Sequence, residues 1–158
     1  MEIQLADLSV PRDADALISL LDAYANDPMG GGAPLSPDVK ARLPGDLAAR
    51  ETCLVLLARL DGVPAGTAVC FEGYSTFAAA PLMNLHDFVV APAFRGKGIA
   101  RALLERVVHE ARHRGCCKVT LEVLANNHRA RGIYERAGFA GYELDPAAGQ
   151  ALFLQKKL

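Results

Sequence analysis

Apolar residues recur along the chain with two spacings, which predict helices and strands in one fold. Helical spacing is clearest over residues 98–114, where one row is formed by Ile99, Leu103, Val107 and Ala111. Weaker helical patterns cover residues 13–25, 36–50 and 127–137. Shorter apolar runs predict strands over residues 2–6, 53–60, 65–74, 82–90, 118–124, 141–144 and 151–156.

Capping and turn residues mark where several of these elements begin or end. Asp13 is predicted to cap the first helix, and Ser36, followed by proline, the second. Asp61-Gly62 is a hairpin signal between two strands. Three consecutive glycines at 30–32 predict a loop, which is either a mobile lid or a flexible connector.

The order of these elements predicts a mixed α/β fold. The 158 residues contain no internal repeat and no low-complexity linker, so we expect one domain over residues 1–158. The strands at 82–90 and 118–124 should be parallel, because a helix connects them and such crossovers are right-handed.

Composition and charge narrow the class of protein. Hydrophobic residues make up 51% of the chain, as in globular proteins. A formal net charge of −1 provides no overall field that would attract nucleic acid. No apolar run reaches the roughly 20 residues that cross a bilayer, and the first residues lack a signal-peptide pattern. We therefore expect a cytoplasmic protein that binds neither nucleic acid nor membranes.

Four cysteines are present, and their spacing is not that of a metal site or a C-x-x-C pair. They are Cys53, Cys70, Cys116 and Cys117. We expect them to pack as small apolar side chains, and we predict no metal.

The strongest chemical signal is the turn between the strand at 82–90 and the helix at 98–114. It reads Arg95-Gly96-Lys97-Gly98-Ile99-Ala100-Arg101. A helix N-terminus presents unpaired N–H groups that bind phosphates, glycines let a ligand approach, and basic side chains add charge. The alternative is an ordinary tight turn with solvated basic residues. The glycine patterns of dinucleotide and nucleoside-triphosphate sites are absent.

Two motifs resemble those of the GNAT acetyltransferases. The pyrophosphate-binding signature of that family is matched by Arg95, Gly98 and Ala100. The helix that flanks the pantetheine arm is matched by Asn127, Ala130 and Tyr134, followed by Gly138 and Phe139. The motifs come in the family's order and cover roughly the C-terminal half of the chain.

The resemblance implies a GNAT-like fold: a mixed, mostly antiparallel sheet flanked by helices, with a parallel strand pair splayed at the cofactor site. It implies acetyl-CoA as cofactor and CoA as product. The pantetheine amides would bind the backbone of Phe88, Val89 and Val90. The pyrophosphate would lie beside Arg95, on the backbone of Gly96, Lys97, Gly98, Ile99, Ala100 and Arg101.

Two side chains of the second motif receive roles from the resemblance. Asn127 would contact the cofactor arm, and it is also a suitable helix N-cap. Tyr134 matches the tyrosine that in many members protonates the departing thiolate, a task that suits a hydroxyl group. The alternative for Tyr134 is a half-buried aromatic residue of the helix.

The reaction also needs a base, because an alkyl ammonium with a pKa of about 10.4 attacks only after losing a proton. Glu122 ranks first, since members that acetylate protein N-termini carry a glutamate there, and His86 ranks second. Asp87 and ordered water are two further candidates for this base. Each of these side chains could equally be structural. Regular alternation would place His86 and Asp87 on opposite faces of the sheet.

These residues predict an acetyl-CoA-dependent N-acetyltransferase that moves an acetyl group to a primary amine of a small molecule, peptide or protein. Transfer would be direct, in a ternary complex. The alternative is a non-catalytic acyl-CoA sensor, against which Tyr134 argues. The resemblance implies an acceptor site built by about residues 24–44 and 139–150. Acidic residues expected near it suit a cationic amine or are solvated surface; they are Asp27, Asp38, Glu72 and Asp145. Edge strands near the C-terminus favour a homodimer.

Overall fold

The computed structural model describes residues 1–142, 147 and 151–158. At its centre lies a sheet of five strands in the order β1-β2-β3-β4-β5. These strands are β1 (Glu2–Leu5), β2 (Cys53–Leu60), β3 (Val63–Ser75), β4 (Ala80–Val90) and β5 (Val119–Leu121). Neighbouring strands are antiparallel from β1 to β4, whereas β4 and β5 are parallel, which confirms the predicted topology.

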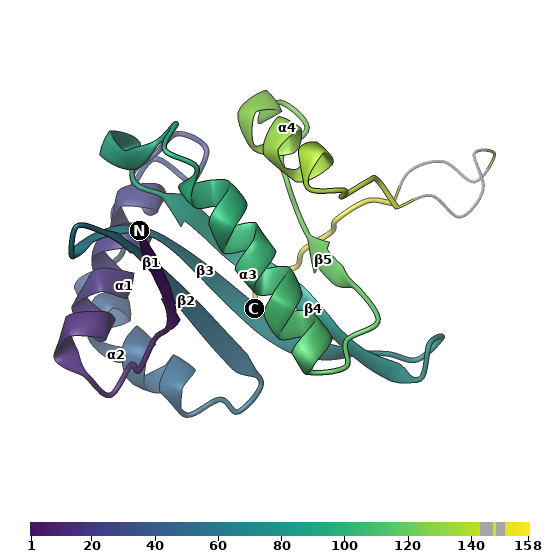
Figure 1. Cartoon of the computed structure of the whole chain (residues 1–158), viewed down its shortest axis with the longest axis horizontal. Coiled ribbons are helices and arrows are strands. Elements are labelled where there is room, and N and C mark those ends of the chain that lie inside the picture. Colours follow the sequence, from purple (N-terminus) through teal and green to yellow (C-terminus); the bar gives the residue numbers. More distant parts are fainter. Residues whose placement is uncertain (143–146, 148–150) are drawn as a thin grey trace.

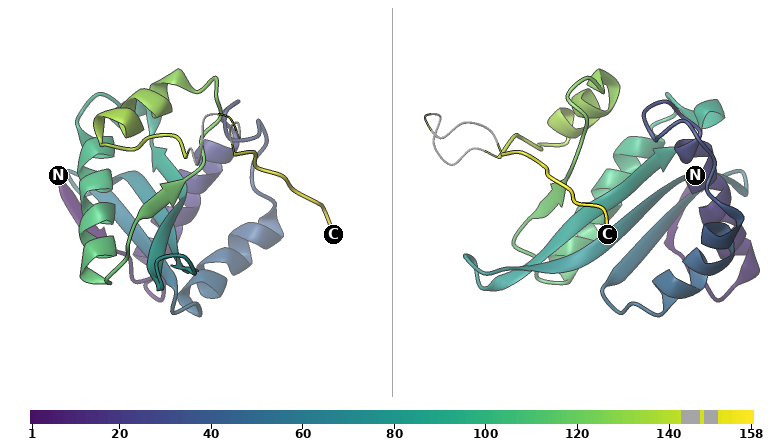
Figure 2. Two further views of the ribbon diagram at one scale, coloured as in Figure 1. Left: turned by 90° about the vertical axis from the view of Figure 1, so that its right-hand side faces the viewer. Right: turned by 180° about the vertical axis from the view of Figure 1, so that it is seen from behind.

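Helices cover both faces of this sheet (Figures 1 and 2). The helices α1 (Pro11–Ala25) and α2 (Pro37–Ala48) pack on one face. The helix α3 (Ile99–His113) crosses the other face, after a short 3-10 turn, η1 (Pro92–Phe94). The helix α4 (His128–Arg136) lies beyond β5, near the end of β4. The mixed, helix-flanked sheet expected from the sequence is confirmed.

The two larger apolar clusters lie on opposite faces of the sheet and hold the layers together, so β2 and β3 are buried on both sides. On one face, Ile99 and Leu103 of α3 pack against sheet residues that include Leu56, Ala68 and Leu85. On the other, α1 and α2 pack against Val55, Val69 and Val89. Burying one valine, leucine or isoleucine side chain stabilises the fold by about 1.5–3 kcal/mol.

A β-bulge interrupts β4 beside the second cluster. Val69 is opposite Asp87, but the next residue of β3, Cys70, is opposite Leu85, so His86 is an extra residue. Asp87 faces the α1 side together with Val69, since directly opposed residues share a face. The His86 ring lies on the same side, edge-on to Phe71 at 5.3 Å between centroids. The prediction of opposite faces is therefore wrong, because a bulge breaks the alternation.

The parallel pair separates along its length. Only Met83–Leu85 of β4 pair with Val119–Leu121 of β5. Beyond this point β4 continues to Val90 with β3 as its partner, and its other edge opens toward α4. The splayed pair implied by the family resemblance is thereby confirmed.

The ends of the helices show one correct and one incorrect prediction. Ser36 caps α2, since its hydroxyl accepts a hydrogen bond from the Val39 N–H at 3.3 Å. Asp13 does not cap α1, which begins at Pro11 with Val10 as N-cap. Its carboxylate is buried and bonds Arg59 of β2 at 2.7 Å instead. Leaving the buried Arg59 charge unpaired would cost more free energy than leaving the start of α1 without a side-chain cap.

The C-terminal segment also differs from expectation. The strand predicted at 151–156 is not formed, and residues 151–158 are exposed without regular structure. A strand requires a hydrogen-bonded neighbour, and this segment has none within the described residues. The strand predicted at 141–144 lies partly outside the described residues, and 141–142 are not in a strand.

Candidate cofactor and acceptor site

The turn between β4 and α3 has a backbone that only glycine adopts readily. Gly96 and Gly98 have φ angles of 78° and 80°, in the left-handed region. A Cβ atom added at either position would meet nothing within 4 Å. Gly98 is the N-cap of α3 and offers no side chain to the first helical turn. An open, uncapped helix N-terminus of this kind is a binding site for phosphate groups.

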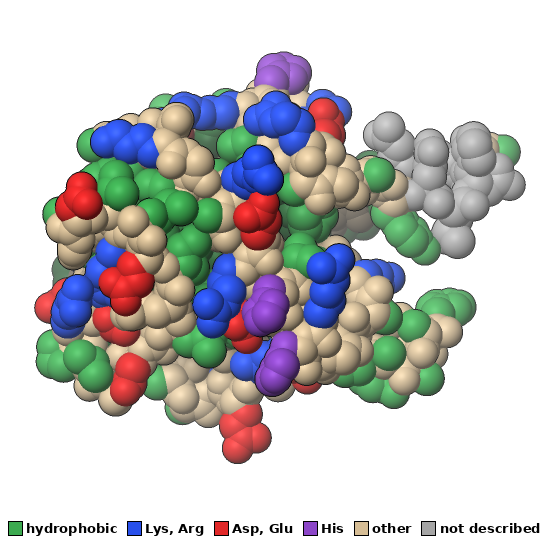
Figure 3. Space-filling view, in the orientation of Figure 1, with side chains coloured by type: hydrophobic (Ala, Val, Ile, Leu, Met, Phe, Trp, Pro, Cys, Tyr) green, Lys and Arg blue, Asp and Glu red, His purple; other side chains and the backbone are tan. Residues whose placement is uncertain are grey.

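A cavity of about 1000 Å³ lies between this turn, α3 and α4. Seven residues predicted to bind the cofactor line it: Val90, Arg95, Gly96, Gly98, Ile99, Ala100 and Arg101. Lys97 is the one residue from Arg95 to Arg101 that does not line the cavity. Its Nζ lies 5.3 Å from the centre of the Phe94 ring. Basic side chains gather along the upper part of Figure 3, over the start of α3 and α4. The cavity therefore suits an elongated, anionic ligand.

Three arginines that line this cavity were not predicted from the sequence. Arg112 comes from the end of α3, and Arg129 and Arg136 come from α4. Arg129 and Arg136 share one face of α4 with Ile133, which also lines the cavity. This helical spacing was the signal available in the sequence. The additional arginines extend the positive charge beyond the turn.

A second cavity of about 220 Å³ adjoins the first, and both are lined by Val90, Arg95, Arg129 and Ile133. The predicted residues Phe88, Val89, Asn127 and Tyr134 line only this smaller cavity. Tyr24 and Met29 complete it from the α1 side, and both belong to the segment 24–44 expected near the acceptor. The two motifs, far apart in sequence, thus meet at adjoining cavities.

Tyr134 is buried at this meeting point, with 8% of its surface exposed. Its ring packs against Phe88 and Phe139, at 5.9 and 6.0 Å between centroids. Burial, with a smaller contribution from Tyr24, raises the pKa of Tyr134 to about 12. The phenol therefore remains protonated at neutral pH and is able to donate a proton or a hydrogen bond.

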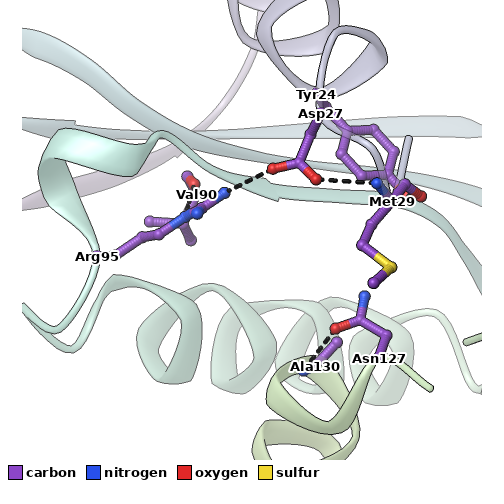
Figure 4. Close-up of polar contacts among 7 residues, drawn as sticks. All are labelled: Tyr24, Asp27, Met29, Val90, Arg95, Asn127 and Ala130. Atoms are coloured by element: carbon purple, nitrogen blue, oxygen red, sulfur yellow. Dashed lines mark hydrogen bonds and ion pairs between the residues drawn. The ribbon is translucent and has the colours of Figure 1, made fainter. Parts of the chain in front are cut away.

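Asn127 caps α4, as one of its two expected roles requires. Its side-chain oxygen accepts a hydrogen bond from the Ala130 N–H at 3.2 Å. Figure 4 shows its amide nitrogen pointing the other way, toward Met29. The capping oxygen fixes the direction in which the two N–H donors of the amide point.

The three candidate bases occupy different environments. Asp87 is half-buried, and burial raises its pKa, partly offset by the neighbouring His86. His86 is exposed, and Glu122 is exposed beyond the last residue of β5. None of the three lines the two cavities described above, although the charge of Asp87 acts on Tyr24, which lines the smaller one. Burial makes the Asp87 carboxylate a better proton acceptor than an exposed aspartate.

The glycine-rich segment after α1 is a hydrogen-bonded turn packed against Tyr24. The N–H of Gly30 donates to Asp27 O at 2.7 Å. A Cβ atom at Gly30 would lie 1.9 Å from the Tyr24 carbonyl oxygen, so this close approach requires glycine. The turn brings Asp27 and Met29 to the wall of the smaller cavity.

The acidic residues named near the acceptor side separate in the structure. Asp27 lines the smaller cavity. Asp38 pairs with Arg42 on the surface of α2, and Glu72 pairs with Arg114. Asp145 lies outside the described residues. Among the three that the structure describes, Asp27 alone lines one of the two cavities.

Two further properties concern the described residues as a set. No group of three histidine, cysteine, aspartate or glutamate side chains among them is arranged to hold a metal ion. Likewise, none of the helices in this part of the chain has the length and apolar character needed to cross a membrane.

The splayed parallel strands, the open glycine turn and the basic groove between α3 and α4 define the class of protein implied by the two motifs. Residues 17–139 match the acetyltransferase (GNAT) family. The chain belongs to this family of N-acetyltransferases.

Solved structures share the whole fold at low sequence identity. A ribosomal-protein-alanine N-acetyltransferase from Brucella melitensis biovar Abortus 2308 is 24% identical, with a TM-score of 0.77 and 99% of both chains covered. A probable acetyltransferase is 21% identical, with a TM-score of 0.81 and coverage of 99% and 100%. The aminoglycoside acetyltransferase AAC(6′)-Iy, in complex with a CoA-linked bisubstrate analogue, is 18% identical, with a TM-score of 0.78 and coverage of 99% and 98%.

Proposed function

We propose that the protein is an acetyl-CoA-dependent N-acetyltransferase that transfers the acetyl group directly to a primary amine within a ternary complex. The observation that supports this most strongly is the pair of adjoining cavities. The larger has an open helix N-terminus and several arginines, and the smaller contains the protonated Tyr134. A cofactor and an acceptor could therefore meet at the wall they share.

The residues of the larger cavity fit the anionic part of acetyl-CoA. The backbone from Gly96 to Arg101 would hold the pyrophosphate, and the empty space beside Gly96 and Gly98 leaves room for it. The unpaired edge of β4, from Phe88 to Val90, would bind the pantetheine amides as an additional strand does. Bound acetyl-CoA would supply a thioester, which is an activated acyl group.

The protein's own groups would serve the two proton transfers. Asp87, assisted by His86, is our preferred acceptor for the proton of the attacking ammonium, directly or through one water. Tyr134 would donate to the departing sulfur. A backbone N–H near Val90 would stabilise negative charge that develops on the thioester oxygen. Glu122 and His86 remain candidates for the base.

The named relatives guide the choice of acceptors to test. One acts on ribosomal-protein alanine, and another is an aminoglycoside acetyltransferase. Both kinds of acceptor carry an amine, so peptide N-termini and aminoglycosides belong in one screen with amino acids and polyamines.

The proposal is tested in two steps with the whole chain. Acetyl-CoA should first raise the melting temperature, because a ligand that binds only the folded state stabilises it. Release of free thiol is then measured with each amine class. Stabilisation followed by thiol release on one class supports the proposal. Stabilisation without turnover favours the acyl-CoA sensor, and absence of stabilisation contradicts both functions.

A further inference from the structure

Arg95 lies at the boundary of both cavities and is held there by two partners. Its Nε donates to the carbonyl oxygen of Val90 at 3.3 Å. Its Nη2 lies 3.4 Å from Oδ2 of Asp27, in the turn that follows α1 (Figure 4). The side chain that matches the pyrophosphate signature is therefore paired with a carboxylate of this chain.

Asp27 has a second attachment that does not depend on Arg95. Its Oδ1 accepts a hydrogen bond from the Met29 N–H at 2.9 Å. This bond and, to a smaller extent, Arg95 lower the pKa of Asp27, so the carboxylate is ionised at neutral pH. The Met29 N–H would keep Asp27 at the cavity wall if Arg95 turned away.

We propose that Asp27 determines acceptor specificity by binding a cationic amine, and that it becomes free to do so when Arg95 turns to the pyrophosphate of acetyl-CoA. This inference rests on the function proposed above. Before the cofactor binds, the guanidinium neutralises the carboxylate. Afterwards the doubly charged pyrophosphate competes for the guanidinium more strongly than one carboxylate does.

The negative charge that Asp27 regains when Arg95 leaves determines which kind of acceptor would bind. With Arg95 bound to phosphate, the carboxylate of Asp27 faces the smaller cavity beside Tyr24 without its arginine. An ammonium group of the acceptor replaces the guanidinium there. The acceptor then needs one nitrogen that binds Asp27 and a second that reacts with the thioester. A diamine has both.

The same pairing couples the two ligands. Each would favour binding of the other, because the cofactor removes the cation that blocks Asp27 and the acceptor removes the anion that holds Arg95. Such coupling is reciprocal by thermodynamic necessity. Acetyl-CoA and the cationic acceptor should therefore bind with positive cooperativity, whichever binds first.

The first test measures CoA affinity by calorimetry in the unmodified protein and in Asp27→Asn. The asparagine keeps an oxygen for the Met29 N–H and loses the charge that holds Arg95. The Asp27 and Arg95 side chains are 29% and 36% exposed, so the pair is weak and CoA should bind about two- to fivefold more tightly in the variant. The matched control is Asp38→Asn, which breaks an aspartate–arginine pair on the surface of α2 and should change nothing.

The second test titrates 1,4-diaminobutane into the free and the CoA-saturated protein. We expect binding to the CoA-saturated protein to be about two- to fivefold tighter, because the same weak pair opposes both ligands, and this difference to vanish in Asp27→Asn. Equal affinity in the two states, or a difference that survives in Asp27→Asn, would overturn the inference. So would weaker CoA binding by the variant, which would make Asp27 a support of the loop. If the unmodified protein does not bind CoA at all, the proposed function fails, and this inference fails with it.

Discussion

At the scale of single residues, burial raises the pKa of Tyr134, which lines the smaller cavity, and of Asp87, whose charge acts on Tyr24 of the same cavity. The two shifts have opposite uses. The pKa of about 12 keeps Tyr134 protonated, which suits a donor. A raised pKa makes the carboxylate of Asp87 more basic than an exposed one, which suits an acceptor. The same physical cause prepares one residue to give a proton and the other to take one.

Replacing Tyr134 with phenylalanine tests the donor. The change keeps the ring contacts with Phe88 and Phe139 but removes the hydroxyl group. We expect kcat to fall by about 10²–10⁴-fold while CoA affinity stays nearly constant, as measured by steady-state kinetics and calorimetry. Tyr74→Phe, on an exposed part of β3, is the control and should be neutral. Parallel losses of turnover and CoA affinity would make Tyr134 a binding residue.

Replacing Asp87 with asparagine tests the base and its pH dependence. In the unmodified protein, kcat/KM should fall as pH is lowered through a pKa above the ordinary aspartate value of 3.8. The variant should lose that limb and about 10²–10⁴-fold of its rate. A folded-state pKa raised above the unfolded value means that ionisation of Asp87 costs stability. Asp87→Asn should therefore be more resistant to urea at neutral pH than the unmodified protein, and this advantage should vanish below pH 3.8. An unchanged pH profile would assign the base to Glu122, His86 or water.

At the scale of elements, α3 has a glycine in the left-handed region at each end. Gly98 precedes it with a φ of 80°, and Gly115 follows it with a φ of 71°. The two positions carry similar backbone strain for any other residue but differ in what surrounds them. Gly98 lines the larger cavity, whereas Gly115 does not.

Alanine substitutions at Gly98 and Gly115 distinguish an effect on stability from an effect on CoA binding. Gly98→Ala and Gly115→Ala should each lower the free energy of unfolding by about 1–2 kcal/mol, because both force alanine into the left-handed region. Only Gly98→Ala should also weaken CoA binding, since its new Cβ points into the space left for the pyrophosphate. Urea unfolding and calorimetry measure the two effects. Equal CoA affinity in both variants would remove the phosphate site from this turn.

The elements also show what the sequence could predict. The turn and α3 were predicted correctly because the glycines, charges and apolar row that define them are local. The bulge at His86 was missed because it depends on the register with β3, which local alternation does not contain. Asp13 was misassigned as a cap because its partner, Arg59, lies 46 residues away. Local sequence signals thus predicted the turn and α3 correctly, whereas these two wrong predictions depended on contacts between residues far apart in the sequence.

At the scale of the whole molecule, the site forms where distant segments meet. The two sequence motifs supplied the residues of β4, the turn and α4. On the acceptor side the sequence indicated only a broad segment, 24–44, because Tyr24 and Met29 reach the smaller cavity through packing of the α1 end against the sheet. The motif side of the site was therefore predictable, whereas the acceptor side required the tertiary structure.

The C-terminal segment leads to a prediction about assembly. Leu152, Phe153 and Leu154 are 80%, 71% and 83% exposed, and β5 is the edge strand of the sheet. Three consecutive exposed apolar side chains favour association, and an unpaired strand edge is a template for it. We therefore expect a homodimer, with a light-scattering mass twice the 16.8 kDa of one chain. Replacing Leu152 and Leu154 with serine should shift the mass toward the monomer without changing CoA affinity, because neither residue lines the cofactor cavity. A monomeric mass for the unmodified protein would contradict the prediction and would leave β5 of the same chain as the remaining partner for this segment.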